Sequence, residues 1–218
     1  MTRVIGVISV MEQMKNSFDH QLLLSRISAI RKVLQGFDRM DDIIIATSDI
    51  EILGWVKAEG LNYEQTFRSN SSTVENCAQV ARRFWSSDII LDIPLDISPE
   101  VVKALHEVKG KMLEDSWMQI ACIRKRIADL TILHQPESIK VVCDRYNKVL
   151  FVSRAAIPYN RNENPGSGTW YEYLPLHAFR NKSLQEITEL RPSPLESSEQ
   201  IEALRWLENN YAMYAFGE

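Results

Sequence analysis

The first 110 residues alternate between short apolar runs and longer segments with helical spacing, and this alternation restricts the fold more than any other feature. The apolar runs are VIGVISV (4–10), DIIIAT (42–47), the weaker NYEQTF (62–67) and DIILDI (88–93). Strands that alternate with helices predict βαβ units, hence an α/β fold with a doubly wound, mostly parallel sheet. Ligands of such sheets bind beyond the carboxyl ends of the strands. The loops after Val10, Thr47 and Ile93 are therefore the first places to look for a site.

The helical segments carry their own start and stop signals. Short polar residues that accept hydrogen bonds from free backbone N–H groups are favoured at helix starts. The predicted N-cap residues are Ser48 or Asp49, Ser72 or Thr73, and Ser98. Pro99 follows Ser98 at the first helical position, where proline is preferred, and Gly60 is a natural helix end. These signals predict the starts of three helices.

The second half of the chain is richer in strand-like runs. These runs are WMQIACI (117–123), SIKVVCD (138–144), KVLFVSR (148–154) and WYEYLPLHAF (170–179). The turn signal RYNK (145–148) predicts an antiparallel hairpin between the second and third of them. Two helices are expected after the last strand, one over 181–190 and one that begins at Pro194. The chain is predicted to form a single α/β domain over residues 1–218.

Composition excludes several classes of function. The net charge is −4, so no broad basic surface for nucleic acid is expected. No stretch approaches the length of a membrane span, and the apolar run near the N-terminus is too short for the core of a signal peptide. The three cysteines, Cys77, Cys122 and Cys143, lie in apolar runs, as buried free thiols in a reducing compartment would. We therefore expect a cytoplasmic protein without a membrane or nucleic-acid partner.

Two arginines flank a stiff apolar segment in the second half. Arg154 and Arg161 lie on either side of AAIPY and just before the loop NENPGSGT (162–169). An arginine pair in such a place fits an anion, because a guanidinium can hold a carboxylate or a phosphate with two parallel hydrogen bonds. The alternative is a strand that ends at Pro158 with two solvated cations.

The same region resembles a known family. The runs SIKVVCDRYNKVLFVSRAAIPYNR, YEYLPLHAFR and RPSPLESSEQIEALR are similar, in order and spacing, to the second half of the 3-deoxy-manno-octulosonate (Kdo) cytidylyltransferases. These enzymes are the CMP-Kdo synthetases of lipopolysaccharide biosynthesis. The resemblance is specific from Ile139 to Arg205. In the first half, IIIATSD and IILDIPLDI fit the family only as generic strand ends would.

The resemblance implies a nucleotidyltransferase-like fold, with a nucleotide-binding half over 1–110 and a sugar-acid and dimerisation half over 111–218. The implied reaction converts CTP and Kdo into CMP-Kdo and pyrophosphate with Mg²⁺, and the implied assembly is a homodimer whose interface includes 149–158. An interface there also fits the apolar length of the segment. On the sugar-acid side the resemblance places Arg154, Arg161, Tyr173, His177, Glu199 and Glu202. The two glutamates also fit surface charges on an amphipathic helix.

The nucleotide side departs from the family. After the first strand, the family has a loop rich in Gly, Pro, Arg and Lys that wraps the triphosphate, whereas SVMEQMKNSFDHQLL (9–23) offers only Lys15. Arg68 and Ser71 echo the family's base-side motif without its Gly, and a plain capped helix start is the stronger interpretation. Asp96 matches the position of the family's first metal aspartate, and a helix-entry residue is the competing interpretation. Asp92, inside the strand run, is no stronger a candidate.

Two function classes follow from these departures. The first is a divergent, C-terminally shortened relative with weak or no catalysis, because the chain stops at YAMYAFGE, before the family's second metal aspartate. Such a pseudoenzyme would act as a binding or scaffolding protein, with CTP or an acidic sugar as ligand or an active paralogue as partner. The alternative is an active divergent cytidylyltransferase for a sugar acid of surface polysaccharide, which would use Mg²⁺. A third, weaker hypothesis is a nucleotidyltransferase with another substrate.

Overall fold

The structure is a computed structural model that describes residues 2–11, 20–34, 40–67, 72–95, 98–161 and 168–217. Its strands are β1 (Val4–Val10), β2 (Asp42–Thr47), β3 (Tyr63–Gln65), β4 (Ile89–Ile93), β5 (Ile120–Arg126), β6 (Lys140–Cys143), β7 (Val149–Ser153), β8 (Tyr171–Arg180) and β9 (Met213–Phe216). Its helices are α1 (His20–Leu34), α2 (Ile50–Ala58), α3 (Thr73–Arg83), α4 (Pro99–Glu114), α5 (Leu130–Leu133), α6 (Asn181–Thr188), α7 (Pro194–Glu199) and α8 (Glu202–Glu208).

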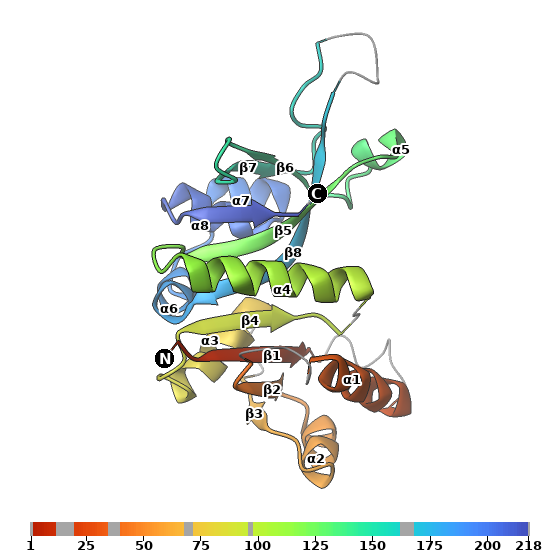
Figure 1. The fold of residues 1–218 in the computed structure, drawn as a ribbon, viewed down its shortest axis with the longest axis vertical. Coiled ribbons are helices and arrows are strands. Elements are labelled where there is room, and N and C mark those ends of the chain that lie inside the picture. The colour runs from red at the N-terminus through yellow and green to blue at the C-terminus, as the bar shows by residue number, and fades with distance from the viewer. Residues whose placement is uncertain are drawn as a thin grey trace.

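All the strands of the described chain join one sheet. The strand order is β3-β2-β1-β4-β8-β5-β9, and β6 pairs with both β7 and β8. The pairings among β1, β2, β3 and β4 are parallel, whereas β8 runs antiparallel to β4, β5 and β6. The predicted α/β class is confirmed, and the parallel character predicted from the first half holds there. β8 returns between β4 and β5 and joins the two halves into one sheet (Figure 1).

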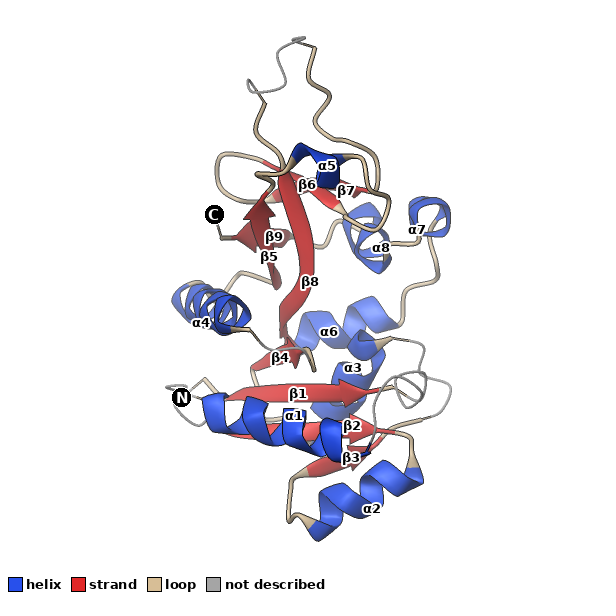
Figure 2. Cartoon of the chain, turned by 90° about the vertical axis from the view of Figure 1, so that its right-hand side faces the viewer, coloured by secondary structure: helices blue, strands red, loops and turns tan. Residues whose placement is uncertain are grey.

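Helices cover both faces of the sheet. Alternate side chains of β1 point to opposite faces, so Ile8 packs with Ile27 of α1 in one core and Val7 packs with Val80 of α3 in the other. The first core also contains the apolar side chains of α2 and α4, and the second those of α6 and α8. Figure 2 shows α4 and α6 on opposite sides of β8. Apolar strands buried on both faces explain why the runs 4–10 and 89–93 contain few polar residues.

The predicted helix starts agree with the structure. Asp49 caps α2, and its side chain accepts hydrogen bonds from the N–H groups of residues 51 and 52. Ser72 caps α3 in a capping box with Glu75, and Ser98 caps α4 ahead of Pro99. The hairpin of β6 and β7 is also confirmed, with Asn147 at φ 67° in its turn.

The single helix expected after Pro194 is instead two helices. Gln200 adopts the left-handed conformation (φ 53°, ψ 48°) between α7 and α8 and breaks the helical run. The break leaves the carbonyl oxygens of Glu199 and Gln200 free to accept hydrogen bonds from Arg154. The hydrogen bonds from the distant Arg154 therefore compete with continuation of the helix through Gln200. The sequence around Gln200 contains no signal for this break.

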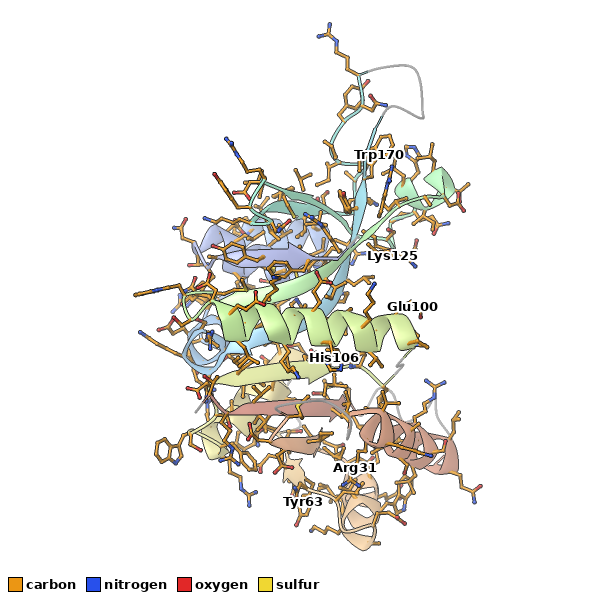
Figure 3. The ribbon with its side chains drawn as sticks, viewed as in Figure 1. Arg31, Tyr63, Glu100, His106, Lys125 and Trp170 are labelled. Carbon is orange, nitrogen blue, oxygen red and sulfur yellow. The ribbon has the colours of Figure 1, made fainter. Side chains whose placement is uncertain are left out.

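Residues 154–161 and 168–170 extend away from the sheet (Figure 1). Trp170, labelled in Figure 3, lies at the base of this extension, packs with Ile127 and Leu133, and donates a hydrogen bond to the carbonyl oxygen of Pro158 across 2.9 Å. None of the helices in the described residues is both long enough and apolar enough to cross a lipid bilayer. Cys77, Cys122 and Cys143 are free thiols, the first two buried and the third half-buried.

Candidate functional site

A cavity of about 440 Å³ lies at the carboxyl edge of the parallel strands, where the sequence directs attention. The ends of β1 and β4, the first turn of α3, the middle of β8 and the start of α8 form its walls. Its lining side chains are Ser9, Thr73, Val74, Asp92, Ile93, Pro94, Leu95, Ile139, Tyr173, Pro175, Leu176, His177, Gln200, Ile201, Glu202, Ala203 and Trp206. Both halves of the chain therefore contribute to one cavity of a size suited to a small molecule.

Asp92 supplies the first carboxyl group of this cavity. It is 6% exposed near the end of β4, and the Thr73 hydroxyl donates a hydrogen bond to its Oδ2 across 2.5 Å. Burial raises the pKa of Asp92 from 3.8 to about 6, although hydrogen bonds from Thr73 and Cys77 act in the opposite direction. Asp92 therefore changes its protonation state close to neutral pH and can donate or accept a proton there.

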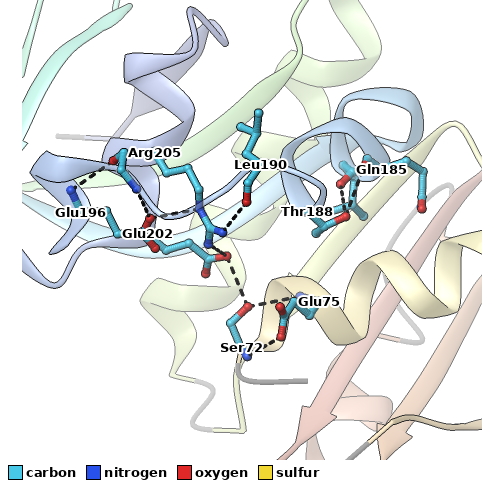
Figure 4. Close-up of polar contacts among 10 residues, drawn as sticks. Ser72, Glu75, Gln185, Thr188, Leu190, Glu196, Glu202 and Arg205 are labelled. Carbon is cyan, nitrogen blue, oxygen red and sulfur yellow. Dashed lines mark hydrogen bonds and ion pairs between the residues drawn. The ribbon is translucent and has the colours of Figure 1, made fainter. Parts of the chain in front are cut away.

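Glu202 supplies the second carboxyl group, at the start of α8 (Figure 4). Its Oε1 accepts hydrogen bonds from Arg205 Nη2 across 3.1 Å and from the Ser72 hydroxyl across 3.4 Å. Burial raises the pKa of Glu202 from 4.5 to about 7, and the Arg205 charge opposes this rise. Arg205 is shared, because its Nε also lies 3.2 Å from Glu196 Oε2. One guanidinium thus balances two carboxylates, which leaves Glu202 incompletely neutralised.

Tyr173 and His177 form a buried pair on β8. Their positions are four apart, so both side chains lie on the same face of the strand, and the Tyr173 hydroxyl lies 2.5 Å from His177 Nε2. Burial lowers the pKa of His177 from 6.5 to about 3 and raises that of Tyr173, so both side chains are neutral at physiological pH. His177 Nδ1 and Trp206 Nε1 are buried with no hydrogen-bond partner among the described residues. Both belong to side chains that line the cavity.

The six residues predicted on the sugar-acid side divide into two sets. Tyr173, His177 and Glu202 line the cavity. Arg154 lies outside it, where its guanidinium donates hydrogen bonds to the carbonyl oxygens of Pro136, Glu199 and Gln200 across 2.7, 2.7 and 3.2 Å.

Glu199 accepts hydrogen bonds from the Ser153 hydroxyl across 2.5 Å and from the Arg154 backbone N–H across 2.9 Å. Arg161 is exposed on the extended segment. Their part in ligand binding stays a prediction, while the contacts of Arg154 and Glu199 fasten β7 to the end of α7.

The predicted nucleotide and metal residues cannot be placed in the cavity. Lys15, Arg68, Ser71 and Asp96 lie outside the described residues. Within the described residues, no group of three or more His, Cys, Asp or Glu side chains could hold a metal ion. The described part of the chain therefore offers no fitted set of ligands for the Mg²⁺ that the resemblance implies.

Two cavity residues, Trp206 and Asp92, are not among the site residues predicted from the sequence, and Asp92 is considered there only as an unfavoured metal candidate. Trp206 reads as an ordinary core residue, and Asp92 reads as an isolated acid within a strand run. A carboxylate in an otherwise apolar, fully buried strand was the available signal, because such a group is retained only with partners or a role. Its position near the carboxyl end of β4 places that role at the ligand-binding edge.

Comparison with known proteins gives consistent matches. A family model described as "Cytidylyltransferase" matches residues 27–213. The chain is 33% identical over 186 residues to a 3-deoxy-manno-octulosonate cytidylyltransferase of Parabacteroides distasonis, which covers 80% of this chain and 72% of the relative. It is 34% identical over 180 residues to the protein of the same name from Bacteroides thetaiotaomicron, which covers 79% of this chain and 72% of the relative.

Solved structures match in fold. A CMP:2-keto-3-deoxy-manno-octonic acid synthetase complexed with CTP aligns with a TM-score of 0.87 over 99% of this chain and 89% of that chain, at 20% identity. A 4-diphosphocytidyl-2C-methyl-D-erythritol synthase from Anaerococcus prevotii aligns with a TM-score of 0.58 over 100% of this chain and 90% of that chain, at 13% identity. The cavity described above is thus built on a nucleotidyltransferase-like fold.

Proposed function

The chain belongs to the 3-deoxy-manno-octulosonate cytidylyltransferase family, and from this premise we propose that it is a ligand-binding or scaffolding member with weak or no nucleotidyl transfer. One observation carries the proposal. The cavity at the carboxyl edge is lined by two carboxyl groups, and the lining side chains that the structure describes include neither lysine nor arginine. A triphosphate needs cationic or N–H donors at that edge, so this wall favours a ligand without phosphate.

The sequence of the first loop supports the same proposal. Residues 9–23 contain one lysine, Lys15, and neither glycine, proline nor arginine. Loss of a single donor to a developing oxyanion commonly costs about 2.7–4 kcal/mol of transition-state stabilisation. Several missing donors would slow nucleotidyl transfer by orders of magnitude, even if their contributions are less than additive.

The partners of the protein are part of this proposal. A homodimer with 149–158 in its interface, or a complex with an active paralogue, would give a non-catalytic member a scaffolding role. CTP and an acidic sugar remain the ligands implied by the resemblance, and surface polysaccharide biosynthesis is the implied setting. We place the protein in the cytoplasm, which fits its free thiols at Cys77, Cys122 and Cys143.

The second candidate function is an active cytidylyltransferase for a sugar acid. It is favoured by the names of the relatives, which are 33% and 34% identical and carry cytidylyltransferase names. Asp92 and Glu202, whose pKa values lie near neutrality, would then be available for proton transfer. Mg²⁺ would be required, and Asp96 is the residue proposed to bind it.

Pyrophosphate release from CTP and Kdo in the presence of Mg²⁺ separates the two functions. The relative from Parabacteroides distasonis, assayed in parallel, is the control for the reagents. We expect no appreciable release by this chain alone and weak or absent binding of CTP–Mg²⁺ in calorimetric titration. Turnover on the order of 1 per second or more would overturn the proposal. If turnover occurs, Asp96→Ala should abolish it, and an active variant would show that Asp96 is not the metal residue.

A further inference from the structure

A second hollow, of about 450 Å³, lies where α3 ends, β4 begins and β8 passes into α6. Figure 2 shows α3 and α6 side by side. Ser87 and Asp88, which directly precede β4, line this amino-edge hollow, so it lies at the opposite end of β4 from the cavity at the carboxyl edge. In the described chain, no residue lines both. The amino-edge hollow is therefore a separate place on the molecule.

The lining of the amino-edge hollow is positively charged. Its charged side chains in the described residues are the three cations Arg82, Arg180 and Lys182 and the single carboxyl group of Asp88, which leaves a balance of two positive charges. The whole chain, by contrast, has a net charge of −4. Positive charges gathered around one hollow attract a ligand of opposite sign. A dianion matches this balance.

Two of these cations are free to exchange their partners. Arg82 Nη2 lies 3.1 Å from Glu189 Oε1, and Lys182 Nζ lies 3.9 Å from Glu186 Oε1. All four side chains are exposed, and ion pairs between exposed side chains contribute little to stability. A bound anion can therefore replace either glutamate at small cost.

Arg180 supplies a fixed charge, and a helix begins directly after it. Its guanidinium donates hydrogen bonds to the uncharged backbone carbonyl oxygens of residues 112, 115 and 118. As the N-cap residue of α6, Arg180 makes no capping hydrogen bond with its side chain. The Asn181 N–H donates to the Asp88 carbonyl oxygen, whereas the N–H groups of Lys182 and Ser183 have no capping side chain among the described residues. Such N–H groups add hydrogen-bond donors for an anion to the three cations.

Trp85 gives the amino-edge hollow an aromatic wall. The residue is 82% exposed, although an indole is one of the largest apolar surfaces that a side chain can bury. Flat rings stack on such a face, and guanidinium groups hold phosphate oxygens with paired hydrogen bonds. The lining thus offers cationic donors and one aromatic surface side by side.

We propose that the amino-edge hollow is a second ligand site, which binds the phosphate group of a phosphomonoester whose ring packs on Trp85. The phosphate oxygens accept hydrogen bonds from Arg82, Lys182 and the first turn of α6, and the dianion balances the charge of the lining. The inference goes beyond the proposed function, because that function is assigned to the cavity at the carboxyl edge. The two can therefore fail independently.

Phenyl phosphate and methyl phosphate are the probes, because both are mostly dianionic at pH 7 and only the first has a ring. Each is titrated into the full chain, and amide signals are followed by ¹⁵N–¹H correlation spectra. We expect saturable shifts of the Lys182 and Ser183 amides with both probes. Phenyl phosphate should bind at least about threefold more tightly, because its ring packs on Trp85. Absence of saturation by either probe at roughly 10 mM would overturn the proposal. Shifts confined to the carboxyl edge, at Thr73 and Val74, would also overturn it.

Charge variants test the cations of the lining. Arg82→Gln and Lys182→Gln each remove one positive charge and should weaken binding of methyl phosphate about three- to tenfold. Lys103→Gln removes the same charge from an exposed position in the first half of α4 and should leave binding unchanged. If Arg82→Gln and Lys182→Gln fold and bind methyl phosphate as tightly as the wild type, the proposal is wrong. Circular dichroism and thermal unfolding establish that each variant folds.

Ring variants test the aromatic wall. Trp85→Ala should abolish the preference for phenyl phosphate over methyl phosphate while leaving the binding of methyl phosphate within about twofold of the wild type. Trp117→Ala is the matched control, because Trp117 is 89% exposed and does not line the amino-edge hollow. It should retain the full preference. A folded Trp85→Ala protein that still prefers phenyl phosphate would contradict the placement of the ring and overturn the proposal.

Discussion

Ser72 donates a hydrogen bond from its hydroxyl to Oε1 of Glu202 across 3.4 Å, although the two residues are 130 positions apart in the sequence. Ser72 also caps α3 and accepts a hydrogen bond from the Glu75 N–H, so its position is fixed from within the first half (Figure 4). Glu202 is held by Arg205 within the second half. The contact therefore joins the two halves beside the cavity that they share.

Asp92→Asn should change how stability depends on pH. The folded-state pKa of Asp92 is raised from 3.8 to about 6, so its contribution is fully present below pH 3.8 and is lost as the pH rises through about 6. The Asp92→Asn variant has no such loss of stability as the pH rises, because its amide does not ionise. We expect its stability relative to the wild type to improve by about 2.4 kcal/mol between pH 4 and pH 7.5. Urea unfolding at both pH values measures the difference.

Comparing Asp92→Asn with the wild type cancels the opposite pH dependence of stability that His177 contributes to both proteins. His177 has a lowered pKa, so its contribution is present above pH 6.5 and is lost as the pH falls through about 3. That contribution is common to the wild type and Asp92→Asn, and it cancels in their difference. Glu208→Gln serves as the control, and its difference from the wild type should not vary with pH. If the stability difference between Asp92→Asn and the wild type also did not vary with pH, Asp92 would not be buried as described.

Tyr173→Phe should destabilise the protein by about 1–3 kcal/mol, because it leaves His177 Nε2 buried and unpaired. The free energy of unfolding in urea at pH 7 measures the effect. Tyr159→Phe makes the same chemical change at a side chain that is 87% exposed, and should stay within about 0.5 kcal/mol of the wild type. Equal stability of both variants would contradict the buried hydrogen bond.

Arg154→Ala should act mainly on stability. The guanidinium donates to three backbone carbonyl oxygens, one in a partly buried and two in exposed hydrogen bonds, so we expect a loss of about 1–2 kcal/mol in the free energy of unfolding. Arg161→Ala, on the exposed end of the same segment, should change it by less than about 0.5 kcal/mol. A stable Arg154→Ala protein that has lost binding of Kdo would instead favour the carboxylate-binding role predicted from the sequence.

Leu150→Glu should dissociate the proposed homodimer. Leu150 lies on β7 with 58% of its surface exposed, inside the predicted interface, and a charge buried there would oppose association. Sedimentation velocity at micromolar concentration should give a dimer for the wild type and a monomer for the variant. Leu22→Glu, on α1 with 44% exposure, is the matched control and should remain dimeric. A monomeric wild type would show that no stable homodimer forms in this range.

Local signals were sufficient for much of the fold. The apolar runs predicted β1, β2 and β4, and the polar residues before each helix predicted the caps at Asp49, Ser72 and Ser98. The parallel arrangement then predicted which edge holds the cavity. These features depend on side-chain periodicity and on hydrogen bonds within a few residues, which the sequence displays directly.

The site itself depends on contacts between distant parts of the chain. The placement of β8 beside β4 brings His177 to the edge where Asp92 lies, and the break at Gln200 separates Glu199 from the cavity-lining Glu202. Arg154, which the sequence offered for an anion, donates hydrogen bonds to three backbone carbonyls, and its role toward a ligand stays a prediction. The sequence determined the elements and the edge, whereas the tertiary structure decided which polar side chains line the cavity. The physical reason is that a buried polar group takes whichever partner the packed chain brings within hydrogen-bond reach, and sequence spacing does not report that partner.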